Sequence, residues 1–450
     1  MRPMFQTYQE ALEWITKLMP LHGIKPGLER TEALLERLGY PHRRLKFIHV
    51  AGTNGKGSTC AFLASVLRGA GYDVGVFTSP FLEKYTNRIQ MNDEDIPEAS
   101  VLAIANRIKP ISDEIEPLHG ALSMFEISTA IAIVYFATEA YPDFVVWETG
   151  MGGRLDSTNV VAPIVSVITN VGLDHTDVLG ETIPQIAREK AGIIKPGVPV
   201  VSTATQPEAA AVIRETAVAR KASLYELGAN FRYDTREVQE GRQTFDFEGP
   251  FRKLENVAIG MDGLHQQTNA ALALMTIEVL RQYYALVVDD EELYAGFERA
   301  RWKGRLEMVS RAPRILLDGA HNPDGAKTLA DTLKQVYSYR RLVFVLGMLR
   351  NKNHPEYLRH ILPIVDTLIV TEPDFFKAMP AGELASAAEA WREANGASLS
   401  IAAEPDWREA LERARRSAGP DDLIVVSGSL YFLSDARARV LNLADSEKGW

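Results

Sequence analysis

The sequence is poor in cysteine and lacks long apolar runs. Cys60 is its single cysteine, so no disulfide can form within the chain, a composition that fits a reducing compartment. No window approaches the ~18 consecutive apolar residues that a membrane-spanning helix needs. The N-terminal stretch also lacks the uninterrupted apolar segment of a signal peptide, and its pattern predicts an amphipathic helix. We therefore expect a cytoplasmic protein with no membrane partner.

An excess of positive charge is also absent. The 49 Lys and Arg residues are outnumbered by 59 Asp and Glu residues, which gives a formal net charge of -10. This balance argues against nucleic-acid partners, so an anionic substrate would have to be attracted by local basic side chains. Low-complexity segments and short-period repeats are absent too. With 46% apolar residues, the chain can bury a large core, and we expect a globular monomer that binds small molecules.

Short apolar runs alternate with longer helical patterns, which predicts βαβ units and a mostly parallel sheet. The first series has expected strands at 46–50, 74–77, 144–147, 164–169 and 198–201, and expected helices at 58–69, 123–140, 183–194 and 263–284. A polar stretch at 227–251 suggests a small antiparallel insertion. The second series has expected strands at 315–317, 342–346, 367–371 and 423–426, and expected helices at 324–337 and 381–394. We place the domain boundary near Arg301, which predicts domains 1–299 and 300–450 with a cleft between them.

A glycine-rich segment at 50–59, VAGTNGKGST, follows an expected strand and opens an expected helix. Glycines let backbone N–H groups close around phosphate oxygens, and the helix N-terminus adds positive potential. Lys56 can then reach the outer phosphates. The spacing departs from the standard P-loop, because Gly57 separates Lys56 from Ser58. The alternative is a turn that binds nothing, but the preceding strand, the lysine and the hydroxyls favour a nucleotide phosphate site.

Two further strand ends carry polar groups downstream of this loop. Glu148 ends an apolar strand, where a carboxylate would suit Mg²⁺ bridged to nucleotide phosphates; otherwise it is an acid that faces water. The segment 169–175, TNVGLDH, ends another strand with Asp174 and His175. A lone histidine is usually structural, so this pattern alone leaves both a metal role and a structural role open.

Other motifs occur in an order that spans almost the whole chain. They are GLER at 27–30, TSP at 78–80, FE at 125–126, GMGGRLDSTN at 150–159, EKAG at 189–192, HQ at 265–266 with Asn269, GR at 304–305, DGAHNP at 318–323 and GSL at 428–430. Together with the phosphate loop, they resemble the folylpolyglutamate synthase family of the Mur ligase superfamily, whose members are often also dihydrofolate synthases. The resemblance implies an α/β fold. Its large P-loop domain, of the Mur ligase central type, has a mostly parallel sheet, and its smaller Rossmann-like C-terminal domain lies on the glutamate side of the cleft.

The resemblance also implies roles for individual residues. The ATP phosphates would be held by Gly52, Thr53, Asn54, Gly55, Lys56, Gly57, Ser58 and Thr59, and ATP would be contacted across the cleft by Asn269, Arg305 and Asp318. Two Mg²⁺ sites would be formed by Ser79 and Glu148, and by Glu148, His175 and a carbamylated Lys190. The folate would be bound by Arg88, Ser123, Phe125, Glu126, Leu155, Asp156 and Ser157, and the incoming glutamate by His321. The catalytic residues would be Lys56, His175, Lys190 and Arg305.

Each of these residues also has a structural interpretation. Phe125 could belong to the core, Asp156 to a turn, and Arg305 to a hinge salt bridge. Lys190 could be a solvated helix lysine paired with Glu189 or Glu181.

Some positions depart from the family pattern. Phe81 replaces a common histidine after Thr-Ser-Pro, and TNRI at 86–89 lacks the usual acid while Arg88 remains. A common D-K-D is Asn351-Lys352-Asn353 here. These changes leave the phosphate loop and the implied metal ligands intact, but they affect the substrate contacts expected near Asn87 and the electrostatics near Lys352.

The implied reaction is ATP-dependent addition of L-glutamate to the γ-carboxylate of folate. The carboxylate would be activated as an acyl phosphate, because it does not react with an amine directly. Whether dihydropteroate is a second substrate stays open. A Mur-type ligase acting on a murein precursor, and a non-catalytic nucleotide switch, are the alternatives. Phosphate release that requires folate and glutamate separates them.

Overall fold

The computed structural model describes residues 4–18, 26–444 and 447. Its largest sheet has eight strands in the order β4-β3-β2-β5-β1-β6-β7-β8. All neighbours are parallel except the β2–β3 and β3–β4 pairs at one edge. The strands are β1 (Phe47–Ala51), β2 (Val74–Phe77), β3 (Ile89–Met91), β4 (Glu94–Asp95), β5 (Phe144–Glu148), β6 (Pro163–Ile168), β7 (Val200–Ser202) and β8 (Leu224–Glu226).

Both faces of this sheet are covered by helices, which is why strands such as β1 and β5 are buried along their whole length. Alternate residues of one strand enter different cores. Ile48 and Val50 pack with α3 (Lys56–Gly69), α9 (Leu264–Tyr284) and α10 (Asp290–Arg299). The opposite face packs against α1 (Tyr8–Lys17), α2 (Glu29–Arg37), α4 (Glu98–His119), α5 (Met124–Tyr135), α7 (Ile183–Ala191) and α8 (Pro207–Ala219), and the short α6 (Thr176–Leu179) adjoins α7.

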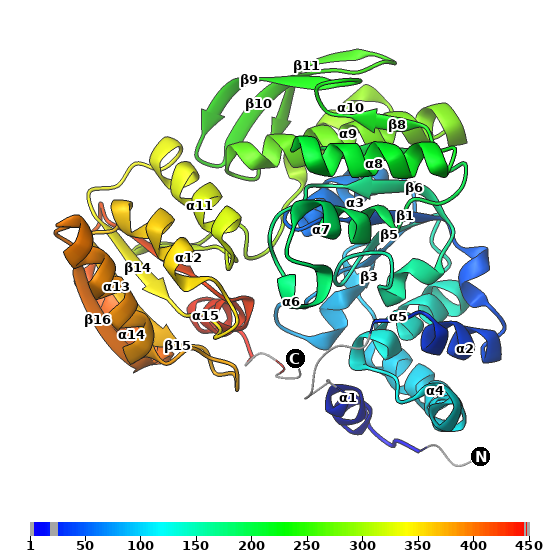
Figure 1. Cartoon of the computed structure of the whole chain (residues 1–450), viewed down its shortest axis with the longest axis horizontal. Coiled ribbons are helices and arrows are strands. Elements are labelled where there is room, and N and C mark those ends of the chain that lie inside the picture. Colours follow the sequence, from blue (N-terminus) through cyan, green and yellow to red (C-terminus); the bar gives the residue numbers. More distant parts are fainter. Residues whose placement is uncertain (1–3, 19–25, 445–446, 448–450) are drawn as a thin grey trace.

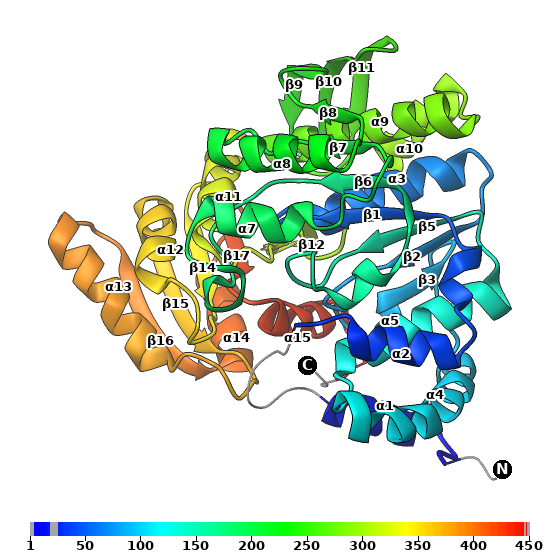
Figure 2. The same cartoon turned by 45° about the vertical axis from the view of Figure 1, so that its right-hand side comes forward.

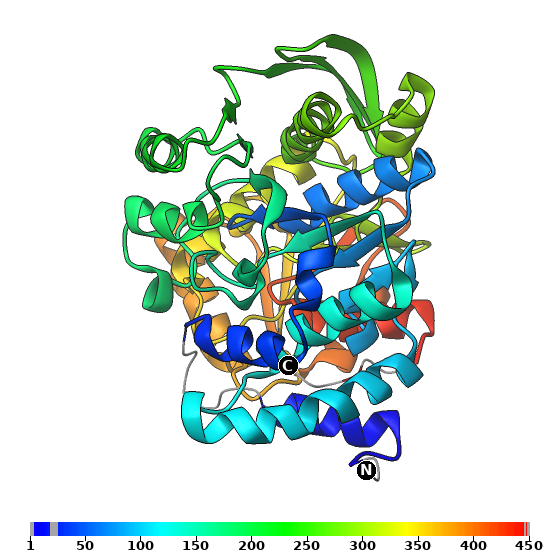
Figure 3. The ribbon, with the colours of Figure 1, turned by 90° about the vertical axis from the view of Figure 1, so that its right-hand side faces the viewer.

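A small antiparallel sheet lies beside α9 (Figure 1). It contains β9 (Arg232–Gln239), β10 (Arg242–Glu248) and β11 (Lys253–Ile259), and it confirms the insertion expected from the polar stretch. Phe245 and Phe247 of β10 point into the core shared with α9. In the view of Figure 3 this sheet lies at the opposite end of the molecule from the helices nearest the N-terminus.

The third sheet has six strands in the order β12-β13-β17-β14-β15-β16, and only β12 is antiparallel to its neighbour. Its strands are β12 (Glu307–Arg311), β13 (Arg314–Leu317), β14 (Leu342–Leu346), β15 (Thr367–Glu372), β16 (Ser400–Asp406) and β17 (Leu423–Ser427). Helices α11 (Pro323–Gln335), α12 (His354–Ile361) and α13 (Ala381–Asn395) cover one face, and α14 (Trp407–Ser417) and α15 (Leu430–Leu441) cover the other. Figure 2 shows the two large sheets as separate layered units.

The predicted α/β class is confirmed, with a large mostly parallel sheet and a smaller C-terminal α/β unit. The helix expected at 183–194 ends earlier, at Ala191, with Gly192 as its C-cap. The helix expected at 123–140 changes at Phe136 into a π-helical turn, Phe136–Ala140. Short 3₁₀ turns occur at Pro41–Arg44, Tyr85–Arg88, Ser157–Val160 and Leu362–Ile364.

The amphipathic N-terminal helix is present as α1, with Ala11, Leu12 and Ile15 buried. Residues 1–3 and 19–25 of the predicted domain 1–299 lie outside the described residues, as do residues 445–446 and 448–450 of the predicted domain 300–450. Within the described part of the chain, no helix is both long and apolar enough to cross a bilayer. The boundary at 299/300 stays a prediction.

Candidate active site

The phosphate loop joins the buried end of β1 to the start of α3. Gly55 is the N-cap residue and adopts a left-handed φ of 83°, which favours glycine. A Cβ at this position would lie 2.4 Å from Oδ1 of Asn269 on α9. The loop therefore passes too close to Asn269 for a side chain at position 55, and Gly55 lies at the N-terminus of α3, where the helix adds positive potential.

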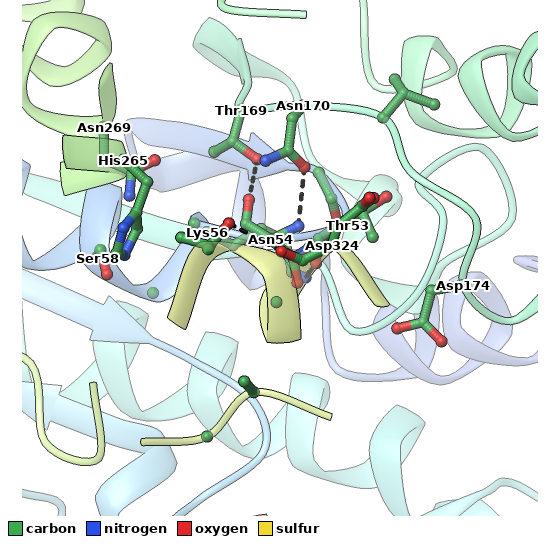
Figure 4. A pocket seen from close by; sticks show the side chains of 18 of the residues that line it. Thr53, Asn54, Lys56, Ser58, Thr169, Asn170, Asp174, His265, Asn269 and Asp324 are labelled. Carbon is green, nitrogen blue, oxygen red and sulfur yellow. Dashed lines mark hydrogen bonds between the residues drawn. The ribbon is translucent and has the colours of Figure 1, made fainter. Parts of the chain in front are cut away.

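The loop is braced by residues at the end of β6 (Figure 4). The N–H of Asn54 donates to Oδ1 of Asn170 at 2.9 Å, and Oγ1 of Thr169 donates to the carbonyl of Asn54 at 2.6 Å. Nζ of Lys56 donates to the carbonyls of Gly52 and Thr53 at 3.1 and 3.3 Å. The loop shape is thus held by protein groups, and the bracing role of Thr169 and Asn170 was missed from the sequence, although their place at a strand end was a usable signal.

Glu148 forms part of the cleft floor, at the end of β5. Its side chain is almost fully buried, and Oε2 accepts a hydrogen bond from the N–H of Ser79 at 2.9 Å. Burial raises the pKa of Glu148, while the charge of Lys56 and the Ser79 N–H act against that shift. The structure therefore brings Ser79 and Glu148 into direct contact, as a shared metal site would require.

Lys190 of α7 and His175 line the same cleft. Lys190 is only 3% exposed, and its amine has no ion-pair partner in the part of the chain that the structure describes. Its suggested partner Glu189 instead pairs with Arg154 at 2.8 Å. Burial, followed by the charge of Lys56, lowers the pKa of Lys190 to about 7. Lys190 is therefore not the solvated helix lysine of the alternative interpretation.

The donor set can be compared with what Mg²⁺ requires. His175 is exposed yet lines the cleft, where enclosure by the walls lowers its pKa to about 4. Among residues 4–18, 26–444 and 447, no group of three or more His, Cys, Asp or Glu side chains could hold a metal ion. Glu148 and His175 alone are thus too few, and a hard cation would need further oxygen ligands from Ser79 and a modified Lys190.

The opposite wall comes from the six-stranded sheet. Asp318 follows β13 and accepts hydrogen bonds from the N–H groups of Leu306 (3.0 Å) and Ala320 (2.9 Å). Its pKa is raised by burial, although the Arg305 charge opposes this. Nη1 of Arg305 donates to the Gly304 carbonyl at 3.1 Å. Asp318 therefore shapes the turn that presents Arg305 to the cleft.

A polar network joins the two walls through Asp174. Its Oδ1 accepts from Nζ of Lys352 at 2.9 Å, and its Oδ2 accepts from Nδ2 of Asn322 at 3.1 Å. Nε2 of His321 lies 3.6 Å from the same Oδ2, and Nδ2 of Asn322 also donates to Oδ1 of Asn54 at 3.1 Å. Burial alone would raise the pKa of Asp174, but His321 and Lys352 together hold it well below its ordinary value. The network ties the phosphate loop directly to the second sheet.

These walls enclose a cleft of about 430 Å³. Most of the residues expected at the nucleotide, metal and glutamate sites line it: Gly52, Thr53, Asn54, Gly55, Lys56, Gly57, Ser58, Ser79, Glu148, His175, Lys190, Asn269, Arg305, Asp318 and His321. Thr59, also expected there, is fully buried in α3 and does not line the cleft. His265 lines the cleft and was not assigned a role from the sequence.

The residues expected at the folate site form a separate group beside the cleft. Ser123 and Glu126 cap α5 reciprocally, and Oε1 of Glu126 accepts from Nε of Arg30 at 2.9 Å. Oδ2 of Asp156 accepts from the N–H of Met151 at 2.8 Å, and burial raises the Asp156 pKa. Ser157 bonds Thr129 at 2.9 Å. These polar groups already serve local structure, so their proposed substrate contacts stay predictions.

Phe125 and Leu155 are half-buried, and they carry the apolar side of this group. The Phe125 ring lies against Gly150, where a Cβ would come within 2.5 Å of it. Gly150 also lines the cleft, so it separates the Phe125 ring from the cleft itself. The residues expected at the folate site therefore lie directly beside the cleft.

The positions that depart from the family pattern have local partners. The guanidinium of Arg88 lies 4.9 Å from the centre of the buried Phe81 ring, and burial lowers the Arg88 pKa to about 10. Oδ1 of Asn87 accepts from the N–H of Lys84 at 2.9 Å, and its amide donates to Asp95 at 2.6 Å. Lys352 keeps an acidic partner in Asp174. Arg88, Asn87 and Lys352 therefore each have a defined partner in the structure.

Comparisons with known proteins can now be set beside this geometry. The Mur ligase middle domain matches residues 50–277, and the Mur ligase glutamate ligase domain matches residues 304–430. The sequence is 39% identical over 442 residues to dihydrofolate synthase/folylpolyglutamate synthase of Bacillus subtilis (strain 168), which covers 97% of this chain and all of the relative. The chain belongs to the folylpolyglutamate synthase/dihydrofolate synthase family of Mur ligases.

Two further members of the family extend this result. Folylpolyglutamate synthase of Lacticaseibacillus casei is 33% identical over 415 residues, covering 92% of this chain and 94% of the relative. A structure of Mycobacterium tuberculosis folylpolyglutamate synthase complexed with ADP matches with a TM-score of 0.88 at 31% identity, covering 98% of this chain and 100% of that one. The expectation of an ATP-dependent ligase of the folylpolyglutamate synthase/dihydrofolate synthase family is thereby confirmed. The roles of individual residues stay predictions.

Proposed function

We propose that this ligase adds L-glutamate to the γ-carboxylate of a folate and releases ADP and phosphate. The observation that carries the proposal is a single cleft with the phosphate loop on one wall and Arg305 and His321 on the other. Sequence similarity to proteins named folylpolyglutamate synthase and dihydrofolate synthase supports folate as the substrate class. We also infer that the functional halves divide at 299/300, since each large sheet has its own hydrophobic cores.

The chemistry follows from the poor reactivity of a carboxylate toward an amine. A γ-carboxylate oxygen attacks the γ-phosphorus of ATP, the bond to the β,γ-bridging oxygen breaks, and ADP leaves. The glutamate amine then attacks the resulting acyl phosphate, loses a proton and forms a tetrahedral intermediate that expels phosphate. Lys56 and Arg305, from opposite walls, are suited to neutralise charge on the transferred group. On binding ATP, the Lys56 amine would exchange its hydrogen bonds to the Gly52 and Thr53 carbonyls for one to a phosphate oxygen.

Ser79, Glu148, His175 and a carbamylated Lys190 would hold the two Mg²⁺ ions. The donor chemistry fits, because Glu148 is a buried carboxylate in contact with Ser79, and Lys190 is buried without a counter-ion in the described chain. A lysine carbamate would supply the oxygen ligand that this wall otherwise lacks. Bound Mg²⁺ would neutralise negative charge on the ATP phosphates.

The substrate ends would take different parts of the cleft. The half-buried Phe125 ring and Leu155, with Ser123, Glu126, Asp156, Ser157 and Arg88 nearby, would bind the ring end of the folate. His321 would face the incoming glutamate, where its contact with Asp174 fixes the imidazole. Closure of the two walls would exclude water, which otherwise hydrolyses the acyl phosphate.

The test is ADP release measured side by side with tetrahydrofolate, dihydropteroate and a murein precursor, each with L-glutamate and ATP. We expect release with tetrahydrofolate that stops when glutamate is omitted. Lys56→Ala should lower the rate by about 10²–10³, or ~2.7–4 kcal/mol, with an unchanged thermal midpoint. Release only with the murein precursor, or release without any acid substrate, would overturn the proposal.

Dihydropteroate is the second candidate substrate, because the Bacillus subtilis relative is named for dihydrofolate synthase as well. ADP release with dihydropteroate in the same assay would establish that activity. Its absence, with tetrahydrofolate active, would leave a folylpolyglutamate synthase alone.

A further inference from the structure

Gly57, the glycine that breaks the standard P-loop spacing, lies against Trp302, a residue of the linker 300–306 that joins α10 to β12. A Cβ at Gly57 would meet three atoms of the Trp302 indole at 2.6, 2.6 and 2.7 Å, and no other atom lies as close. Real Cβ atoms do not approach other atoms this closely, and an indole ring cannot move aside like a flexible chain end. The indole therefore rests directly on the backbone of the first turn of α3.

The backbone of Gly57 gives no reason of its own for a glycine. The residue lies inside α3, and its φ is not in the left-handed region. At a helical position, alanine is ordinarily more stable than glycine. Outside the backbone of α3, the three atoms nearest to a side chain at Gly57 thus all belong to the Trp302 ring.

The guanidinium groups of two arginines in the same linker also lie against glycines. A Cβ at Gly260 would meet the Arg301 guanidinium at 2.0 Å, and one at Gly319 would meet that of Arg305 at 1.8 Å. Trp302 itself is half-buried and packs on the core beneath α3. Because Gly57 and Gly319 both line the cleft, Trp302 and Arg305 contact opposite walls, and the two residues are only three positions apart.

We propose that Trp302 is a positioning residue whose indole, seated on Gly57, fixes the distance between the phosphate loop and Arg305. Its effect on catalysis rests on the proposed function, in which Lys56 and Arg305 act on one phosphoryl group from opposite walls. The extra glycine of the loop is then the space that this ring requires. Removing the ring, or filling its space, displaces Arg305 relative to Lys56.

A double-mutant cycle tests this seat, with Gly57→Ala, Trp302→Ala and the combined variant. Each single variant should lower kcat/KM for ATP by about ten- to a hundredfold, because small misplacements of catalytic groups are costly. In the Trp302→Ala background, Gly57→Ala should cost less than twofold and should raise the thermal midpoint. In the wild-type background, the same substitution should lower the midpoint.

Losses that multiply in the combined variant would overturn the proposal, as would unchanged kinetics of Trp302→Ala. Trp391→Ala is the matched control, because Trp391 is also half-buried but packs within the smaller α/β unit. It should lower the thermal midpoint and leave KM for ATP unchanged. If Gly57→Ala does not fold, Gly57→Ala with Trp302→Phe replaces it and should regain folding; failure to regain it would count against the seat.

The same cycle measured by ADP binding in a calorimeter requires no acid substrate. Non-additive effects of the two substitutions on ADP affinity would support the proposed role of the Trp302–Gly57 contact even if the acid substrate proves not to be a folate. Additive affinities in an enzyme that is active with folate would refute the seat and leave the proposed function standing.

Discussion

His49 lies at the centre of β1, where its imidazole is fully buried. Nε2 is 3.0 Å from Oγ1 of Thr158, and Nδ1 has no partner in the described chain. Burial, with a smaller effect of Lys195, lowers the His49 pKa to about 3. Since an unfolded histidine binds a proton near ~6.5, the unfolded state binds more protons below that pH, and stability falls as the pH decreases toward 3.

We therefore expect His49 to cost ~2 kcal/mol of unfolding free energy between pH 7.5 and pH 5. His49→Gln should remove that part of the pH dependence while keeping a polar contact to Thr158. Urea unfolding at the two pH values measures it, and His119→Gln, at an exposed histidine, should leave the wild-type slope. Equal slopes for wild type and His49→Gln would show that His49 does not set the acid sensitivity.

The proposed carbamate on Lys190 can be tested by changing this single side chain. Lys190→Ala should lower activity by about a hundredfold or more, because a ligand of the phosphate-neutralising site is lost. Acetate or formate should partly restore the variant by filling the vacant ligand position. Wild-type enzyme in buffer stripped of CO₂ should lose activity reversibly. A variant that keeps near-wild-type turnover would contradict the carbamate.

The N-cap residue of α11, Asn322, both stabilises this helix and makes contacts across the cleft. Its Oδ1 caps α11 by accepting from the N–H of Gly325 at 2.8 Å, while its Nδ2 reaches Asn54 and Asp174. Asn322→Ser keeps a capping oxygen and should leave stability within ~0.5 kcal/mol, yet lower kcat/KM. Asn322→Ala should lose both, with ~1 kcal/mol of stability.

The measurements are urea unfolding and steady-state kinetics on the same preparations. Asp406→Ala removes the cap of α14 and serves as the control, because it should lower stability and leave kinetics unchanged. Asn322→Ser with wild-type kinetics would show that the contacts across the cleft are dispensable.

The elements that the sequence predicts correctly are those with a local signal. β1 and β5 are buried on both faces, so their apolar runs are continuous. Helix α4 escaped prediction because Pro110 and Pro117 lie inside it, and proline ordinarily marks a helix end. The short edge strand β4 has only two residues and no apolar period to detect.

The same distinction holds within the site. The phosphate loop is one contiguous segment, and its glycines and lysine are recognisable in order. The contacts that tie the walls together are not local: Asn54 and Asn322 are 268 positions apart, and Asp174 and Lys352 are 178 apart. Nothing in either segment alone indicates its partner, so these contacts had to come from the structure.

For the whole molecule, the cleft lies where the carboxyl ends of two parallel sheets face each other. β1, β5 and β6 deliver the loop, Glu148 and Asn170, while β13 delivers Asp318. Away from the cleft, the two units also touch through the small antiparallel sheet. Arg314 pairs with Glu240 at 2.9 Å, and the Tyr337 hydroxyl donates to Asp262 at 2.5 Å. Contacts on both sides of the linker therefore fix the facing walls.

If catalysis requires both walls, the fragment 1–299 should fold, bind ADP weakly and release no ADP from ATP. It holds the phosphate loop, Glu148 and Lys190, and its main cores are formed within it. It lacks Arg305 and Asp318, and losing charged contacts of this kind should weaken ADP binding by about a hundredfold. Cooperative thermal unfolding would establish folding, and calorimetry would give the affinity.

A fragment ending at residue 303 is the matched control, because it keeps Trp302 on Gly57 but still lacks Arg305, and it should be equally inactive. Folate-dependent ADP formation by either fragment would show that the second wall takes no part in the chemistry.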